Sequence, residues 1–177
     1  MIGLQNGIQL RKLVRLDAAE LYAAIDRDRN HISRWLPWLN DAYGRADALK
    51  FLELSEARTA AGDALDLAIL IEGKIGGAIG FHQIDKLNRS SSIGYWLGSK
   101  HGGKGIVTEA CRALVTEGFR TYKLHRIEIR CATGNTRSCA IPHRLGFTEE
   151  GILHEAEWLH DHWVDLRVFS MLEPNWR

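Results

Sequence analysis

The chain has 177 residues, of which 45% are hydrophobic, and its 23 basic residues nearly balance its 22 acidic ones, for a net charge of +1. This length and composition predict one domain over residues 1–177 with a sizeable core. The balanced charge argues against an extended surface for nucleic acid or anionic membrane, so any anion site has to be local.

Cysteine usage and the lengths of the apolar runs indicate the compartment. Cys111, Cys131 and Cys139 lack the spacing of a zinc site or a disulfide framework, and we expect them to be small buried side chains in a reducing environment. No segment is apolar for long enough to span a bilayer, and the N-terminus has no secretory pattern. These features predict a soluble cytoplasmic protein that binds neither membrane nor metal.

The first third of the chain is predicted to contain one strand and two helices. Residues 8–11 alternate apolar and polar, as in a half-buried strand. Asp17 and Glu20 have the spacing of a capping box, which predicts a helix from there to about residue 28. A second helix is expected over residues 46–61, where a glycine follows it.

The middle of the chain changes to strand patterns. Apolar residues at 67–71 and 75–81 flank a short turn and predict a hairpin, and a further strand is expected at 91–97. A glycine-rich loop at 98–105 then leads into apolar residues at helical spacing over 106–122. The chain therefore passes from a strand through a glycine-rich loop into an amphipathic helix.

The last third predicts a strand at 126–131, a short helix at 135–145, and a long hairpin formed by 147–158 and 163–172. The order of elements is strand, two helices, three strands, helix, strand, helix and two strands. This order indicates a mixed α/β sandwich around one sheet.

The glycine-rich loop, Gly102-Gly103-Lys104-Gly105-Ile106, carries the first functional signal. Backbone N–H groups and the positive end of a helix dipole converge there, and Lys104 and Thr108 add a charge and a hydroxyl, as a pyrophosphate site requires. The loop has neither P-loop nor Rossmann spacing, which disfavours ATP and NAD. Glycines also serve merely to form turns, and by itself the loop leaves that alternative open.

Several blocks together resemble the GNAT superfamily of N-acetyltransferases and, within it, the ribosomal-protein-serine acetyltransferases of the RimJ/RimL type. The resemblance extends almost from end to end of the chain. The blocks that carry it are Ile93-Gly94-Tyr95-Trp96-Leu97, Gly103-Lys104-Gly105-Ile106-Val107-Thr108-Glu109-Ala110, Asn135-Thr136-Arg137-Ser138, Arg144-Leu145-Gly146-Phe147, Glu150-Gly151, Trp35-Leu36-Pro37-Trp38 and residues 80–88.

The resemblance implies a fold and a cosubstrate. The fold is a single GNAT-like α/β (α+β) domain with a mixed, mostly antiparallel seven-stranded sheet, splayed central strands and helices on both faces. Acetyl-CoA is expected in the V between residues 93–97 and 126–131, with its pyrophosphate on the glycine-rich loop. The implied binding residues are Tyr95, Trp96, Leu97, Gly102, Gly103, Lys104, Gly105, Ile106, Val107, Thr108, Asn135 and Ser138. The family loop usually opens with Gln or Arg, so Gly102 predicts weaker binding of CoA.

Acetyl transfer from a thioester to an amine needs a base for the amine, donors for the carbonyl oxygen and a proton for the departing sulfur. Glu157 resembles the proposed base of RimL-type enzymes, and its neighbours Trp158 and Trp163 are expected to raise its pKa by desolvation. The alternative is that Glu157 is a solvated charge at a strand end. His82 is the reserve base.

Two further roles come from the resemblance. Backbone N–H groups around 95–97 are expected to bond the thioester carbonyl. Ser138 is expected to face the CoA sulfur as a hydrogen-bond donor that eases its departure, with Asn135 on the pantetheine arm. Both residues also suit a helix N-terminus, and capping is the alternative.

Trp35 and Trp38, together with His82, are expected to line the acceptor groove, although the two tryptophans could equally be core. The first hypothesis is that the acceptor is a protein N-terminus and, more specifically, that of a ribosomal protein. The alternatives are a small amine, either a polyamine or an aminoglycoside, and a CoA-binding module without turnover. The resemblance also implies a homodimer.

Overall fold

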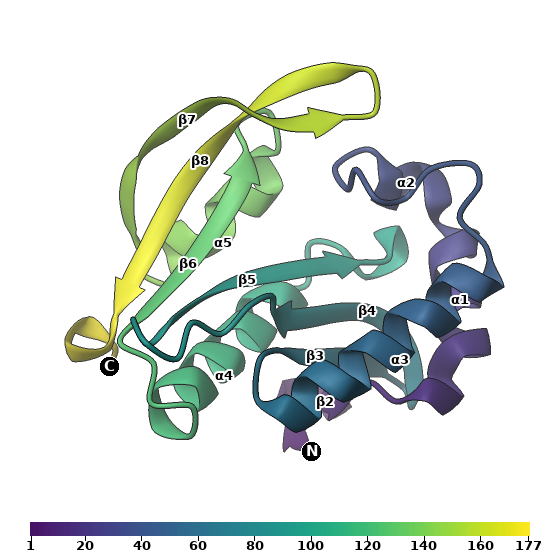
Figure 1. Ribbon diagram of the computed structural model, residues 1–177, viewed down its shortest axis with the longest axis horizontal. Coiled ribbons are helices and arrows are strands. Elements are labelled where there is room, and N and C mark those ends of the chain that lie inside the picture. Colours follow the sequence, from purple (N-terminus) through teal and green to yellow (C-terminus); the bar gives the residue numbers. More distant parts are fainter.

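The computed structural model describes all 177 residues and contains one eight-stranded sheet in the order β1-β2-β3-β4-β5-β6-β8-β7 (Figure 1). All neighbours are antiparallel except β5 and β6, which are parallel. The strands are β1 Ile2–Gly3, β2 Gln9–Lys12, β3 Leu65–Ile71, β4 Lys74–Phe81, β5 Ser90–Leu97, β6 Arg126–Ala132, β7 Thr148–Leu159 and β8 His162–Leu172. The strand beyond the seven expected is β1, whose two residues are too few to produce an alternating pattern.

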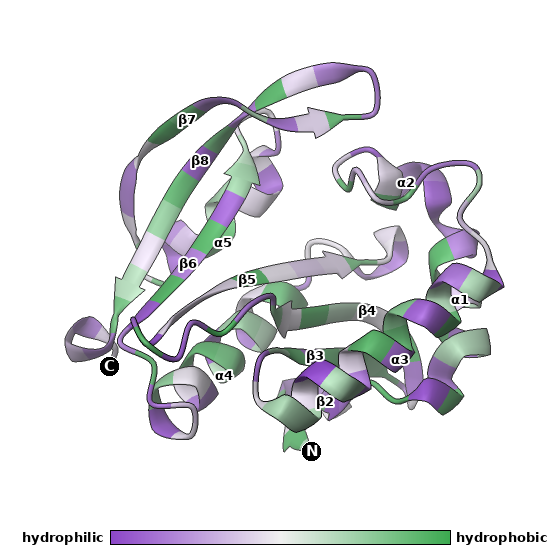
Figure 2. Ribbon diagram, in the orientation of Figure 1, coloured by the Kyte–Doolittle hydropathy of each residue, from purple (hydrophilic) through white to green (hydrophobic).

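Helices cover both faces of this sheet, as the resemblance implied (Figure 1). The helices are α1 Ala18–Arg27, α2 Arg29–Ser33, α3 Arg45–Ala61, α4 Ile106–Arg120 and α5 Thr136–Arg144. Successive side chains of β3 enter different cores: Ile69 packs in the cluster that contains α4, and Ala68 and Leu70 pack in the cluster that contains α1. From Leu67 onward β3 is therefore apolar without alternation, whereas β6 alternates (Figure 2).

The start of α1 differs from the expected capping box. The Asp17 side chain makes no cap bond to α1, and it accepts instead from the Val14 amide at 2.9 Å and from Arg11. Glu20 likewise turns to the sheet, where it accepts from the Ile75 amide at 2.7 Å. The predicted helix is correct, but these two carboxylates tie it to neighbouring strands because unpaired donors were available there.

The central strands separate partway along their length. β5 and β6 pair from Ser90 and Arg126 only as far as Ile93 and Ile129. Beyond that point β5 stays paired with β4, and β6 stays paired with β8, so each strand is held on one side and open on the other. Figure 1 shows the two strands diverging from this point. The expected V is therefore present between the two halves of the sheet.

Candidate functional site

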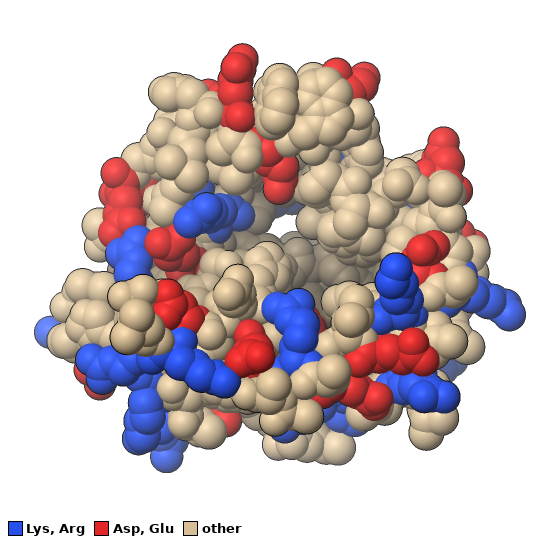
Figure 3. Space-filling view, in the orientation of Figure 1, with Lys and Arg blue, Asp and Glu red and all other residues tan.

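A cleft of about 1800 Å³ opens where β5 and β6 diverge. Figure 3 shows an opening through the molecule in this region, between the β7–β8 hairpin and the segment around α2. All of the site residues expected from the sequence line the cleft except Lys104, which is exposed. The predicted residues therefore gather at one place, although they come from five separate parts of the chain.

The glycine-rich loop presents a row of unused backbone donors at one end of the cleft. Gly103 and Gly105 both have φ of 76°, a left-handed conformation that favours glycine, and Gly105 is the N-cap of α4. None of the six backbone N–H groups from Gly103 to Thr108 has an acceptor within the protein. These donors, at the positive end of a 15-residue helix, fit a pyrophosphate.

The open edge of β5 carries two more backbone donors. Gly98 donates to the Gly76 oxygen and Ser92 accepts from the His82 amide, so even-numbered residues of β5 bond β4. Because the direction of backbone groups alternates along a strand, the N–H groups of Tyr95 and Leu97 face the cleft. The Trp96 N–H belongs to the even-numbered residues that bond β4. Of the three N–H groups at 95–97, only those of Tyr95 and Leu97 are therefore free to donate to a thioester carbonyl oxygen.

Side chains join the two strands where the backbone ladder has ended. The Tyr95 hydroxyl lies 3.0 Å from Ser138 Oγ, and Ser138 Oγ in turn donates to Cys131 Sγ at 3.2 Å. Burial raises the pKa of Tyr95 well above its usual value, and raises that of the Cys131 thiol to about 12, so both groups are neutral donors or acceptors. The side chain of Tyr95 was not expected to take part, since sequence periodicity does not show which residues meet across a cleft.

Asn135 begins α5 in the way that the capping alternative described. Its side-chain oxygen accepts from the Ser138 amide at 3.2 Å, and the residue also lines the cleft. This cap holds the first turn of α5 in place. The orientation of Ser138 toward Tyr95 and Cys131 therefore rests on a local hydrogen bond as well as on packing.

Glu157 is a half-buried carboxylate without a cationic partner, and burial raises its pKa above the usual value. The direction of this shift and its cause, desolvation, are as expected. Glu157 is opposite Val164 in the hairpin, whereas Trp158 is opposite Trp163, and alternation places the two pairs on opposite faces. The two tryptophans pack edge to face at 5.2 Å and are 48% and 55% exposed. Glu157 lines the cleft, whereas neither tryptophan does.

His82 lies at the end of β4, with its ring over β5. A Cβ on Gly94 would lie 2.1 Å from His82 Nε2, so only glycine at 94 leaves room for the ring. The ring retains considerable exposed surface within the cleft, yet desolvation by the surrounding walls lowers the pKa of His82. A mainly neutral imidazole at neutral pH follows from this environment.

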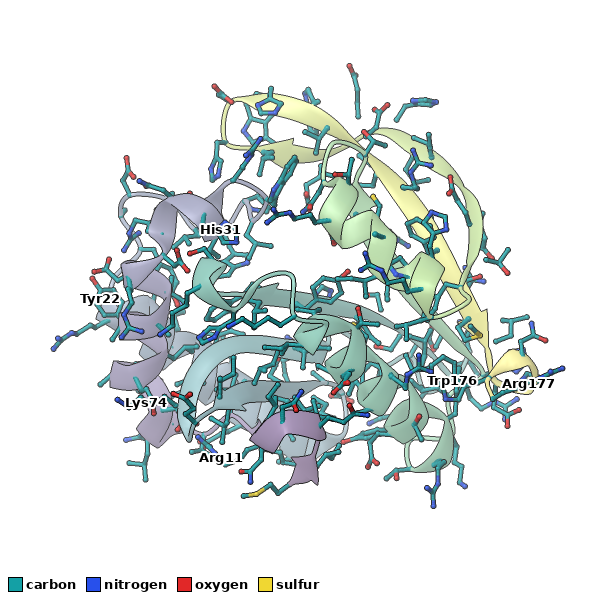
Figure 4. All side chains as sticks on the ribbon, turned by 180° about the vertical axis from the view of Figure 1, so that it is seen from behind. Arg11, Tyr22, His31, Lys74, Trp176 and Arg177 are labelled. Atoms are coloured by element: carbon teal, nitrogen blue, oxygen red, sulfur yellow. The ribbon has the colours of Figure 1, made fainter.

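The segment of residues 28–43, here called the helical arm, borders the other end of the cleft. Trp35 lies against Gly134, since a Cβ there would be 3.3 Å from the Trp35 ring, and Trp38 packs against Tyr43 at 5.4 Å. Both tryptophans line the cleft, and Trp38 is 44% exposed, so the core alternative does not describe it. Seen from behind, His31 lies on the side of the arm that borders the opening (Figure 4).

Two groups of cleft residues were not selected from the sequence. Three exposed arginines line it from α4 and α5, namely Arg112, Arg137 and Arg144. Asp66 of β3 also lines it, with one carboxylate oxygen accepting from Ser55 Oγ at 2.8 Å. Charged residues are mostly exposed on protein surfaces, so neither the arginines nor Asp66 has a sequence signal that marks a site.

Metal-binding clusters and membrane-spanning helices are both absent from the structure. No group of three or more His, Cys, Asp or Glu side chains is arranged to hold a metal ion. None of the helices combines the length and the apolarity needed to cross a membrane. The three cysteines are free and buried, as expected.

Comparisons with known proteins identify the family. Residues 8–148 match the model of the acetyltransferase (GNAT) domain. The Bacillus subtilis (strain 168) protein YdaF, whose name assigns it provisionally to the ribosomal N-acetyltransferases, is 33% identical over 96% of this chain and 93% of its own length. The ribosomal-protein-serine acetyltransferase of Escherichia coli (strain K12) is 28% identical over 97% of this chain and 96% of its own.

Solved structures agree with the family assignment. The self-immunity acetyltransferase MccE, in complex with acetyl-CoA and AMP, superimposes with a TM-score of 0.90 at 33% identity over 96% of both chains. A RimL enzyme in complex with coenzyme A shares the fold at a TM-score of 0.92, with 24% identity over 97% of both chains. The chain therefore belongs to the GNAT acetyltransferases and is an acetyl-CoA-dependent N-acetyltransferase.

Proposed function

We propose that this enzyme acetylates the N-terminal α-amine of a protein, and of a ribosomal protein in particular. One observation carries the proposal: the cleft is bridged at the acceptor end. His160 Nε2 lies 2.7 Å from the Ser33 carbonyl oxygen, and Trp35 lies against Gly134. Contacts from both halves of the molecule favour an acceptor that enters end-on, as a free chain terminus does. The names of YdaF and of the E. coli ribosomal-protein-serine acetyltransferase support the choice of a ribosomal protein.

We assign binding of the cosubstrate to the loop and the open strand edge. The free N–H groups from Gly103 to Thr108 would hold the pyrophosphate, and Asn135 would border the pantetheine arm. Acetyl-CoA, when bound, supplies the thioester carbonyl that the amine attacks. The N–H groups of Tyr95 and Leu97 would donate to its oxygen as negative charge develops there.

Glu157 is assigned as the base. A carboxylate whose pKa is raised takes up a proton from an amine more readily than an ordinary one, and Glu157 has no cation that would hold its pKa down. Ser138, which can accept from the Tyr95 hydroxyl, would turn its one hydroxyl proton from Cys131 Sγ to the departing sulfur. His82 remains the reserve base, because its neutral ring also lines the cleft.

A small-molecule amine is the second candidate. The observation that favours it is the MccE complex, in which a relative of 33% identity was solved with AMP as well as acetyl-CoA. A small amine can also enter the cleft at the end that the His160–Ser33 contact bridges. The two candidates share the chemistry proposed for Glu157 and differ only in what the helical arm contacts.

The test is release of free thiol from acetyl-CoA with a panel of acceptors. The panel contains peptides beginning with Ser, Ala or Met, the same peptides with a blocked N-terminus, and polyamines and aminoglycosides. Turnover with free but not blocked peptides, with the acetyl group on the α-amine by mass spectrometry, is the expected result. Turnover confined to the small amines would replace the substrate proposed here.

Two wider expectations depend on this substrate. A ribosomal acceptor implies a cytoplasmic enzyme, and its recognition would need no contact with nucleic acid. The homodimer implied by the resemblance remains a prediction, which light scattering on the purified protein would test.

A further inference from the structure

A single carboxylate joins the helical arm to the loop that follows β5. Asp28 Oδ2 accepts from the Ser99 backbone N–H at 2.5 Å, and Asp28 Oδ1 accepts from Ser99 Oγ at 2.8 Å. The two residues are 71 positions apart in sequence. Gly98 makes the approach possible, because a Cβ there would lie 3.1 Å from Asp28 Oδ2. Two charge-assisted hydrogen bonds to one side chain define the geometry of this junction.

On the arm side, Asp28 determines where α2 begins. Its backbone oxygen accepts from the amides of His31 and Ile32, each at 3.0 Å. Arg29, the next residue, donates to the carbonyl oxygens of Asn40 and Tyr43 at 2.7 and 2.8 Å and so ties the two ends of the arm together. The arm from residue 28 to 43 is therefore one connected unit, attached to the loop at Asp28 and to the β7–β8 hairpin through Ser33.

On the loop side, Ser99 opens the 3-10 turn Ser99–His101, which leads directly into the glycine-rich loop. Figure 1 shows this turn at the end of β5, on the side of α2. Gly102 donates back to the Ser99 oxygen at 3.1 Å, so the turn is hydrogen-bonded to the first residue of the loop. Only three residues separate Ser99 from Gly103, the first of the free amides. An anion bound to those amides therefore orders a segment that is hydrogen-bonded to Asp28 through Ser99.

We propose that Asp28 is a positioning residue that couples occupancy of the phosphate loop to the position of the helical arm. Binding of the CoA pyrophosphate to the loop restricts the position of Ser99. Because Ser99 is hydrogen-bonded to Asp28, the same binding orders the arm that carries Trp35 and Trp38. The coupling is reciprocal, so an acceptor that orders the arm strengthens CoA binding by the same factor. The inference rests on the placement of CoA in the proposed function and not on the identity of the acceptor.

The test is amide hydrogen exchange of the whole protein with and without CoA, which needs no acceptor. In the wild-type chain CoA should slow exchange in the loop amides 103–108 and also, by about tenfold, in residues 29–43. D28A removes both carboxylate oxygens, so neither the Ser99 N–H nor Ser99 Oγ has a side-chain partner on the arm. In D28A at saturating CoA, protection of the loop should remain and the slowing in the arm should fall below about twofold.

Two further variants separate coupling from general loosening. S99A removes only the Oγ bond, and an intermediate slowing of exchange in the arm is expected. D41A truncates an exposed aspartate of the same arm that makes no contact with the loop, and should retain the wild-type effect. Full protection of the arm by CoA in D28A would overturn the proposal, as would wild-type protection confined to the loop. Neither result depends on which amines are acetylated, so failure of the proposed acceptor is detected separately.

Discussion

The Tyr95 hydroxyl lies 3.0 Å from Ser138 Oγ, and this contact connects β5 to the first turn of α5 at the place where β5 and β6 no longer pair. A splayed pair of strands would otherwise leave the base of the cleft open to movement. Because Ser138 also bonds Cys131 on β6, the three side chains bridge the V at its open side. The arrangement orients Ser138 by a hydrogen bond from one strand and an acceptor on the other.

Removing the hydrogen bond between Tyr95 and Ser138 should lower kcat and leave the affinity for CoA unchanged. We expect Y95F and S138A each to lower kcat about fivefold to tenfold, because each loses one hydrogen bond of about 1 kcal/mol that supports departure of the sulfur. The double variant should cost less than the product of the two effects, since both changes break the same contact. Steady-state kinetics and calorimetric CoA binding measure these quantities. Strictly multiplicative losses would show that the two side chains act independently.

The base assignment predicts a specific pH profile. E157Q should lower kcat about 100-fold or more and leave the Kd of CoA within about twofold. Since the pKa of Glu157 is raised above the usual 4.5, the protonated and inactive form persists above pH 4.5, and wild-type kcat should rise with pH through the elevated pKa.

The same rise should be absent from the residual activity of E157Q. A wild-type profile that is preserved in E157Q but abolished in H82Q would transfer the role to His82. Both variants should be compared at saturating acetyl-CoA, so that changes in cofactor affinity do not enter kcat.

Neighbouring glycines of the loop should respond in opposite ways. Gly102 has φ of −62°, a conformation open to any residue, and family members usually carry Gln or Arg there, so G102R should tighten CoA binding. Gly105 has φ of 76° at the helix N-terminus, and G105E combines backbone strain with a negative charge at the anion site. Its Kd should rise beyond measurement. Tight CoA binding by G105E would refute the placement of the pyrophosphate.

Acid stability should depend on Glu150 through its hydrogen bonds to Arg126 and Ser170. These contacts lower the pKa of Glu150 from 4.5 to about 2. A carboxylate with a lowered folded-state pKa stabilises the fold above its unfolded pKa, and that contribution is lost as pH falls through the folded value. E150Q should therefore be less stable than wild type above pH 4.5, with a difference that vanishes toward pH 2.

The size of this effect is limited by exposure. Because the side chain of Glu150 is 39% exposed, solvent screening should limit the difference to about 1 kcal/mol. Urea denaturation of both chains across pH 2–7 measures it. A difference that does not change with pH would show that Glu150 acts through packing and not through its charge.

Local patterns in the sequence determined most of the fold. Apolar spacing, continuous apolar runs, a capping-box spacing and turn glycines located seven of the eight strands and four of the five helices. The two elements that were missed, β1 and α2, contain two and five residues. Elements this short hold only through their neighbours, so they carry little periodicity of their own. The phosphate loop could also be recognised locally, because its donors belong to consecutive residues.

Contacts between distant residues were decided only by the tertiary structure. Spacing along one strand cannot reveal that Tyr95 meets Ser138, that Asp28 holds Ser99, or that Trp158 faces away from Glu157. These relationships depend on strand register and on where two strands part, which are set by packing across the whole sheet. The sequence by itself therefore determined the helices, the strands and the expected acetyl transfer. The connection between the helical arm and the phosphate loop, through Asp28 and Ser99, exists only in the folded chain.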